Sequence, residues 1–166
     1  ACLVLRRLNK VWGHGGHDLR LVLHAIGQPE AFTACALLGT ARKWRSLTPF
    51  VSPLHAKFYR DGRPKLDASG WQQGSAAHAL LRLLAKHPGG AGATIRQLDE
   101  RGRPFRFGSV NLRSLQFQTR RSGGAGSRGC HSGCAFEIIF PQPVTGPLAF
   151  GYGAHFGLGL FVPVET

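Results

Sequence analysis

The C-terminal part of the chain carries the pattern best suited to binding phosphate. A single histidine, His155, lies among four glycines, and an apolar segment follows at once; the glycines are Gly151, Gly153, Gly157 and Gly159. Glycine allows backbone N–H groups to turn outward and a bulky polyanion to approach the main chain. Histidine in such a loop can supply a proton, a hydrogen bond or a positive charge. The pattern therefore predicts a phosphate-binding loop.

The charge balance indicates which phosphate compound is bound. The chain holds 21 Lys and Arg against 8 Asp and Glu, which gives a net charge of +13 and a pI near 11.0. Such an excess is typical of proteins that bind polyanions, and together with the glycine loop it points to RNA. The alternative is a basic protein whose arginines cover solvated surfaces.

His55 and His155 have the chemistry needed to cut RNA without a metal. Such cleavage needs a base for the 2′-hydroxyl, an acid for the 5′-oxygen and cations for the phosphate. We expect His55 to act as the base and His155 as the acid or as a phosphate ligand. Lys57 or Arg45 would stabilise the charge. In the alternative, each histidine forms a hydrogen bond to the backbone of a turn.

Two groups of cations are expected to contact RNA. The first flanks Trp44 and is the densest basic and aromatic cluster of the chain. The second lies in and beside the glycine- and serine-rich segment 121–133, a composition that is also typical of a solvated loop. Arginine offers phosphate a bidentate fork. The predicted RNA-binding cations are Arg42, Lys43, Arg45, Arg120, Arg121 and Arg128.

Other histidines and the cysteines give weaker signals. His14 and His17, in a glycine-rich turn, form a second candidate pair. The run Cys130-His131-Ser132-Gly133-Cys134 is compatible with zinc, but structural zinc needs four ligands, normally as two separated pairs. Cys2 and Cys35 do not form such a pair. We therefore expect no metal, no cofactor, and reduced cysteines in a cytoplasmic protein.

The clearest predicted element is a helix over 76–86. Ser75 is suited to cap it, and its apolar face consists of Ala77, Leu80, Leu81 and Leu84. The run His87-Pro88-Gly89-Gly90 ends the helix. His78 inside the helix is assigned a structural role, as is His87, since the helix dipole favours positive charge at its end.

The strand pattern predicts an α+β fold. Strands are expected at 2–7, 18–25, 44–51, 93–98, 104–107, 110–120, 134–140 and 158–162, with a turn at 99–103 and a short helical turn at 145–150. From Trp44 onward the order is strand, helix, strand pair, strand, short helix and strand. This is the βαββαβ order of a ferredoxin-like sheet. Residues 1–43 are expected to be N-terminal strands from a preceding domain, and 44–166 the ferredoxin-like domain.

The ends and the hydropathy of the chain set further expectations. No apolar stretch approaches the ~18 residues of a membrane span, so no membrane contact is expected. The chain begins at Ala1 and contains no methionine. We therefore expect it to be a fragment of a longer protein.

Two motifs together resemble a known family. They are the runs Arg45-Ser46-Leu47-Thr48-Pro49-Phe50-Val51, followed by His55, and Gly146-Pro147-Leu148-Ala149-Phe150-Gly151-Tyr152-Gly153-Ala154-His155-Phe156-Gly157-Leu158-Gly159-Leu160-Phe161. They resemble the CRISPR-associated RAMP superfamily. The chain is most similar to the repeat-processing part of the fused backbone-and-processing subunit of type I-G (formerly I-U) systems, over about residues 44–164.

The resemblance implies a metal-independent endoribonuclease that cuts CRISPR repeat RNA and often keeps the product within a type I effector complex. It implies that the four glycines of the C-terminal loop lie against RNA. The cut would leave a 2′,3′-cyclic phosphate and a 5′-hydroxyl. Two alternatives stay open: a non-catalytic subunit of the same complex that holds the crRNA, and a structural protein–protein module whose basic surface is incidental.

Overall fold

The computed structural model describes residues 7, 9–11, 19–98, 105–107, 110–112 and 133–164. The chain forms two compact units, Ala1–Ala34 and Cys35–Thr166. The second unit thus begins before the predicted domain start at 44.

In the first unit, β1 (Lys10–Val11) pairs antiparallel with β2 (Leu19–Arg20). A 3₁₀ turn, η2, covers Pro29–Phe32. The strand predicted over 18–25 is therefore restricted to β2. The apolar side chains that follow β2 remain exposed, with Val22 at 90%, and so they gain nothing from an extended, half-buried strand. The strand predicted over 2–7 lies outside the described residues except for Arg7.

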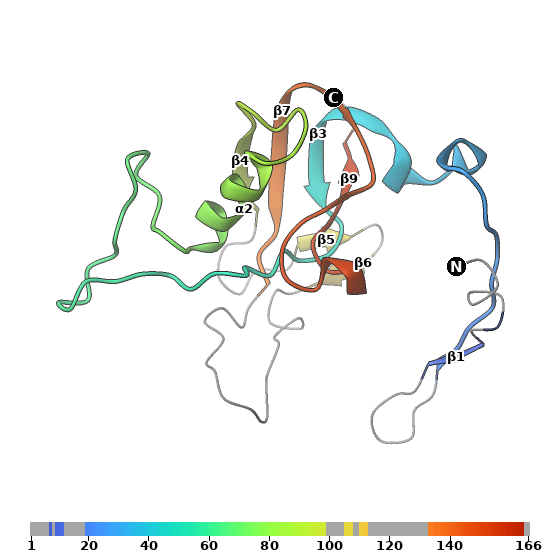
Figure 1. Ribbon diagram of the computed structural model, residues 1–166, viewed down its shortest axis with the longest axis horizontal. Coiled ribbons are helices and arrows are strands. Elements are labelled where there is room, and N and C mark those ends of the chain that lie inside the picture. The colour runs from blue at the N-terminus through green and yellow to red at the C-terminus, as the bar shows by residue number, and fades with distance from the viewer. Residues whose placement is uncertain are drawn as a thin grey trace. The chain divides into compact units, whose positions relative to one another are not determined.

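The second unit is built on a five-stranded antiparallel sheet in the order β4-β7-β3-β9-β8 (Figure 1). Its strands are β3 (Thr40–Ser46), β4 (Thr94–Gln97), β7 (Phe136–Thr145), β8 (Leu148–Ala149) and β9 (Leu160–Pro163). The helix α2 (Ala76–Leu84) packs on this sheet, and the 3₁₀ turns η3 (Ala36–Leu38) and η5 (Ala154–Phe156) lie in its connections. The fold is therefore α+β.

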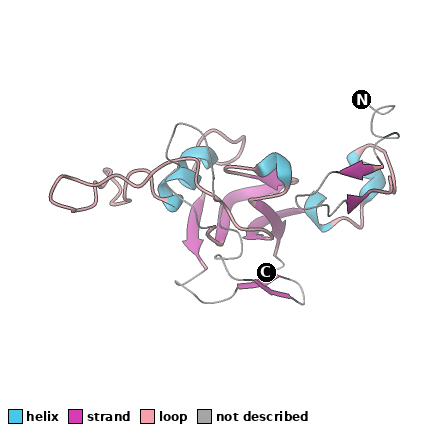
Figure 2. Cartoon of the chain, turned by 90° about the horizontal axis from the view of Figure 1, so that it is seen from below, coloured by secondary structure: helices cyan, strands magenta, loops and turns pink. Residues whose placement is uncertain are grey.

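The core lies between one face of the sheet and α2, which form two layers in Figure 2. In β7, Phe136, Ile138 and Phe140 alternate toward this face and are fully buried. Leu80 and Leu84, four positions apart on α2, pack against them. The period of two in the strand and of about four in the helix produces one shared apolar layer.

Helix α2 begins where the sequence predicts. The Oγ of Ser75 accepts a hydrogen bond from the His78 N–H at 3.2 Å, which confirms the predicted cap. The helix ends at Leu84, before the predicted end at Lys86. There the Lys86 and His87 N–H groups donate to the Leu83 and Leu84 carbonyls, three residues back, which tightens the last turn. In the described part of the chain, no helix is both long and apolar enough to cross a membrane.

Two predicted strands pair differently from the expected arrangement. The sequence predicts that segments 93–98 and 104–107 flank a common turn and form a strand pair, but no described residues of the two segments pair with each other. Instead β4 pairs with β7, and β5 (Phe105–Phe107) pairs with β6 (Val110–Leu112) in a separate sheet. β3 covers 40–46 rather than 44–51, because the residues after it form hydrogen bonds with the C-terminal loop.

The helical turn predicted over 145–150 is wrong. β7 continues through Pro141 and Pro143, and β8 follows after the cis Gly146–Pro147 peptide. The pairing of β7 with β3 shifts register in this stretch. A register shift releases positions from the hydrogen-bond ladder, so proline, which lacks an N–H, is tolerated there.

Candidate functional site

Residues 57–73, between β3 and α2, form a projecting arm of extended backbone. Single bridges join Phe58 to Pro64 and Leu66 to Gln72. Backbone hydrogen bonds join the three extended segments of the arm to one another. The Lys65 N–H donates to the Lys57 carbonyl at 3.0 Å, the Gln73 N–H to the Lys65 carbonyl at 2.7 Å and the Lys57 N–H to the Gln73 carbonyl at 2.8 Å. Figure 1 shows the arm as the long loop at the left.

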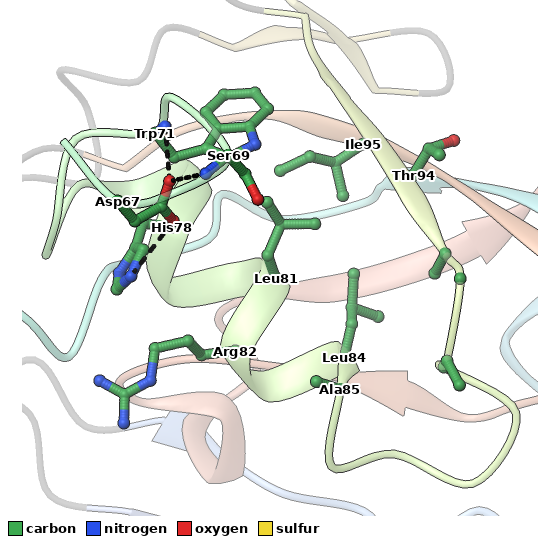
Figure 3. A pocket seen from close by; sticks show the side chains of 14 residues that line it. Asp67, Ser69, Trp71, His78, Leu81, Arg82, Leu84, Ala85, Thr94 and Ile95 are labelled. Atoms are coloured by element: carbon green, nitrogen blue, oxygen red, sulfur yellow. Dashed lines mark hydrogen bonds and ion pairs between the residues drawn. The ribbon is translucent and has the colours of Figure 1, made fainter.

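Asp67 and His78 hold the base of the arm to α2. The Oδ1 atom of Asp67 accepts hydrogen bonds from the N–H groups of Ser69 and Trp71, each at 2.9 Å (Figure 3). The Nδ1 atom of His78 accepts the Gly74 N–H at 3.1 Å. The proton of the neutral ring therefore lies on Nε2, which faces Oδ2 of Asp67 at 3.7 Å. His78 positions the arm and offers no free basic nitrogen.

A cavity of about 460 Å³, here called the His55 cavity, lies between the base of the arm and α2. Its polar lining residues are His55, Lys57, Asp67, Gln73, His78 and Arg82. The side chains of His55, Lys57 and Arg82 form no hydrogen bond or ion pair with the described residues. The cavity therefore offers one imidazole and two cations to an anion from solvent.

A second cavity, of about 500 Å³ and here called the Trp71 cavity, adjoins the first. The two share Asp67, His78 and Arg82. Leu81 of α2 and Ile95 of β4 face the Trp71 cavity (Figure 3). Trp71, Leu81 and Ile95 contribute apolar side chains to its walls, so it can take a planar or apolar group.

The structure brings two of the predicted catalytic residues to one cavity. His55 and Lys57 both line the His55 cavity. His155 lies in η5 and is exposed, and its ring is tilted by 46° against that of Phe156 with 4.1 Å between the centroids. It is absent from the lining of both cavities. Its role as an acid or phosphate ligand stays a prediction.

The backbone conformation of the C-terminal loop explains why its four positions are glycine. All four have a positive φ, in the region that favours glycine: +95° at Gly151, +74° at Gly153, +86° at Gly157 and +61° at Gly159. A Cβ at Gly159 would overlap the Phe150 carbonyl, and one at Gly151 would lie 2.6 Å from the Val51 oxygen. At Gly157, by contrast, a Cβ would meet nothing within 4 Å.

The loop also uses amide groups to hold itself to the rest of the protein. The N–H of Tyr152 donates to the Val51 carbonyl and that of Gly159 to the Pro49 carbonyl, each at 2.9 Å. The Thr48 hydroxyl donates to the Gly157 carbonyl at 2.7 Å. These amides are not available to a ligand, and contact of the loop with RNA stays a prediction.

On the sheet face away from α2, Glu137 lies between two arginines. Its carboxylate accepts hydrogen bonds from Arg45 at 2.9 Å and from Arg96 at 3.0 Å. The three residues are directly opposite one another on β3, β7 and β4. Burial by itself raises the pKa of the Glu137 carboxyl, but the hydrogen bonds and charges of Arg45 and Arg96 outweigh it and hold the pKa below its usual value.

The other predicted RNA-binding cations are placed as follows. Arg42 is exposed and donates through Nε to the Phe140 carbonyl at 3.3 Å, while Lys43 is half-buried. Several predicted site residues lie outside the described residues; these are Arg120, Arg121, Arg128, His14 and His17.

Sequence reasoning missed Asp67 and Arg82 and gave His78 only a place in the helix. A signal was present, because His78 and Arg82 are four positions apart and so share one side of α2. Asp67 precedes Ser69 and Gly70, a composition typical of a turn closed by the aspartate side chain. Neither signal shows that these residues meet His55.

Within the described ranges, no group of three His, Cys, Asp or Glu side chains could hold a metal ion. Cys130 and His131, considered above for zinc, lie outside those ranges.

Comparisons with protein-family models, with curated proteins and with solved structures found no match to this chain.

Proposed function

We propose that this chain is an RNA-binding domain of the CRISPR-associated RAMP type that cleaves CRISPR repeat RNA without a metal ion. The observation that carries the proposal is the His55 cavity. There His55, Lys57 and Arg82, none of them paired within the described part of the chain, surround a space of about 460 Å³. The net charge of +13 favours a polyanion as the occupant.

The strand order supports a ferredoxin-like sheet of unusual form. β3 and β4 run parallel and are connected through α2, while β7 lies between them and is antiparallel to both. This order supports the proposed split βαβ unit of that fold. β9 lies on the other side of β3. Where the second helix would follow β7, the chain has β8 and η5 instead.

In the proposed reaction His55 takes the proton of the 2′-hydroxyl, and the 2′-oxygen attacks the adjacent phosphorus. The bond from phosphorus to the 5′-oxygen breaks, and that oxygen receives a proton from Lys57. The products are a 2′,3′-cyclic phosphate and a 5′-hydroxyl. Arg82 stabilises the charge of the pentavalent phosphate. His78 acts only through Asp67 and Gly74, which it holds in place.

On this proposal the partners of the chain are the crRNA and the other subunits of a type I effector complex in the cytoplasm. The non-catalytic alternative differs in one respect only. It uses the same cations to hold RNA and has no need of the imidazole of His55.

End-labelled CRISPR repeat RNA, incubated with the protein in excess EDTA, tests the proposal. The control RNA carries a 2′-deoxy substitution at the cut nucleotide. A discrete cut that survives EDTA and disappears with the 2′-deoxy substitution is the expected result. Tight, salt-sensitive binding without a cut would overturn the proposed cleavage and favour a non-catalytic subunit that holds the RNA. RNA that neither binds nor is cut would overturn both.

A further inference from the structure

The arm has two chemically different faces. Successive side chains of an extended strand alternate between faces, and directly paired residues share one. The pairing of Phe58 with Pro64 therefore places both on one face, here called the apolar face, which also carries Leu66. The opposite face, here called the cationic face, carries Lys57, Tyr59, Arg63, Lys65, Asp67, Trp71 and Gln73.

Contacts between side chains support this division. The Lys65 ammonium lies 5.1 Å from the centroid of the Tyr59 ring, and the Arg63 guanidinium carbon lies 5.7 Å from it. Tyr59 is nevertheless 53% exposed. The cations thus gather around an aromatic ring that is still open to solvent, with cation–π attraction between them.

The carboxylate at the tip of the arm belongs to Asp61, and Arg63 donates hydrogen bonds to it. Asp61 accepts the Arg63 N–H at 3.0 Å and the Arg63 Nε–H at 2.7 Å. The backbone N–H of Arg63 first, and then its guanidinium, lower the pKa of Asp61. Asp61 therefore closes the turn and orients Arg63. Within the described residues, Lys57 and Lys65 have no carboxylate partner.

The cationic face continues into the His55 cavity. Lys57 and Gln73 belong both to this face and to the lining of the cavity. The Lys57 N–H donates to the Gln73 carbonyl at 2.8 Å, which fixes the junction. An extended anion that enters the cavity can therefore continue past Lys65 and Tyr59. The Asp67 carboxylate on the same face accepts hydrogen bonds from the Ser69 and Trp71 N–H groups.

We infer that the cationic face of the arm is a binding track for single-stranded RNA that leads to the His55 cavity. This inference rests on the proposed function and deepens it. Proteins hold single strands with cations along the phosphates and aromatic rings against the bases, and the track supplies both. A protein partner would use the apolar face, which therefore serves as the control surface.

The test compares the affinity of the full chain for a short, labelled oligouridine by fluorescence anisotropy over a range of salt. The double variant Arg63→Gln/Lys65→Gln is expected to bind roughly tenfold more weakly at low salt. Its plot of log affinity against log salt should be shallower by about 1.4, which is about 0.7 for each lost phosphate contact. Phe58→Ala, on the apolar face, should bind like the wild type.

A charge-preserving variant, Arg63→Lys/Lys65→Arg, is expected to bind like the wild type. It shows whether weaker binding of the Gln variant comes from the lost charge or from a disturbed arm structure. Unchanged affinity and slope in the Gln variant overturn the track, as does a loss of binding in Phe58→Ala alone. Repeat-RNA cleavage is measured on the same proteins. If the wild type binds RNA without cutting it while the Gln variant loses affinity, the proposed cleavage is overturned and the proposed binding track is supported. If the wild type does not bind at all, both fail.

Discussion

The C-terminal glycine loop and the arm both carry groups suited to phosphate, and they use those groups in opposite ways. In the loop, the amides of Tyr152 and Gly159 bond to carbonyls of 47–51, and the glycines allow this close approach. In the arm, Lys57 lines the His55 cavity, Lys65 lies over the Tyr59 ring, and neither has a carboxylate partner among the described residues. The comparison shows that donors already bonded to carbonyls inside the protein contribute less to a binding site than cations that stay accessible at its surface.

The same distinction separates two sets of cations. Arg45 and Arg96 are held by Glu137 and stabilise the sheet between β3 and β4. Lys57 and Arg82 line the His55 cavity without such a partner. A polyanion would have to compete with Glu137 for the first pair but not for the second.

The largest expected effect contrasts the two candidate histidines. His55→Ala should lower the single-turnover rate of repeat-RNA cleavage about 100- to 10,000-fold, because a general base contributes about that much. His155→Ala should lower it by less than about tenfold, since His155 does not line the cavity. Quenched-flow or gel assays in EDTA measure both rates. A large loss with His155→Ala and a small one with His55→Ala would move the active site to the glycine loop.

The next effect tests whether the glycine loop is required for packing. Gly159→Ala should reduce the free energy of unfolding by about 3 kcal/mol or more, because its Cβ would overlap the Phe150 carbonyl at a positive φ. Gly157→Ala, with open space around it, should cost only about 1 kcal/mol for its φ of +86°. Urea unfolding measures both. Equal, small losses would leave the loop free for a ligand.

A smaller effect concerns Glu137 and depends on pH. Because its pKa is lowered in the folded protein, the stabilisation is complete above the unfolded-state pKa of about 4.3 and is lost as pH falls through the folded-state pKa. Glu137→Gln should therefore cost about 2 kcal/mol at neutral pH, and the difference from the wild type should shrink in acid. The free energies of unfolding of both proteins, measured from neutral pH down into acid, check this prediction. A difference that stays constant into acid would show that Arg45 and Arg96 do not depend on this charge.

The smallest effect concerns the helix that holds the arm. Ser75→Ala removes the acceptor of the His78 N–H and should cost about 1 kcal/mol of stability. Affinity for oligouridine should not change, because the cations of the arm remain. Thermal unfolding and anisotropy measure the two quantities. Weaker RNA binding in this variant would mean that the arm depends on α2 more closely than its contacts indicate.

Elements with strong local signals could be predicted from the sequence. The Ser75 cap and the apolar spacing of Leu80 and Leu84 predicted α2, and the alternation of Phe136 and Ile138 predicted part of β7. Elements whose form depends on distant partners could not. The segment 145–150 has the cap and proline typical of a helical turn, yet β9 supplies hydrogen bonds that make part of it a strand. Local propensity is weak against such pairing.

The candidate site shows the same limit. The amino-acid sequence by itself determined the charge of +13, the positions of the imidazoles and the need for glycine in a tight loop. Only the tertiary structure decided that His55, Lys57 and Arg82 line one cavity, and that the Gly159 N–H donates to the Pro49 carbonyl. The reason is physical: composition sets how many donors and charges a chain has, but the fold decides which of them find partners inside the protein and which remain for a ligand.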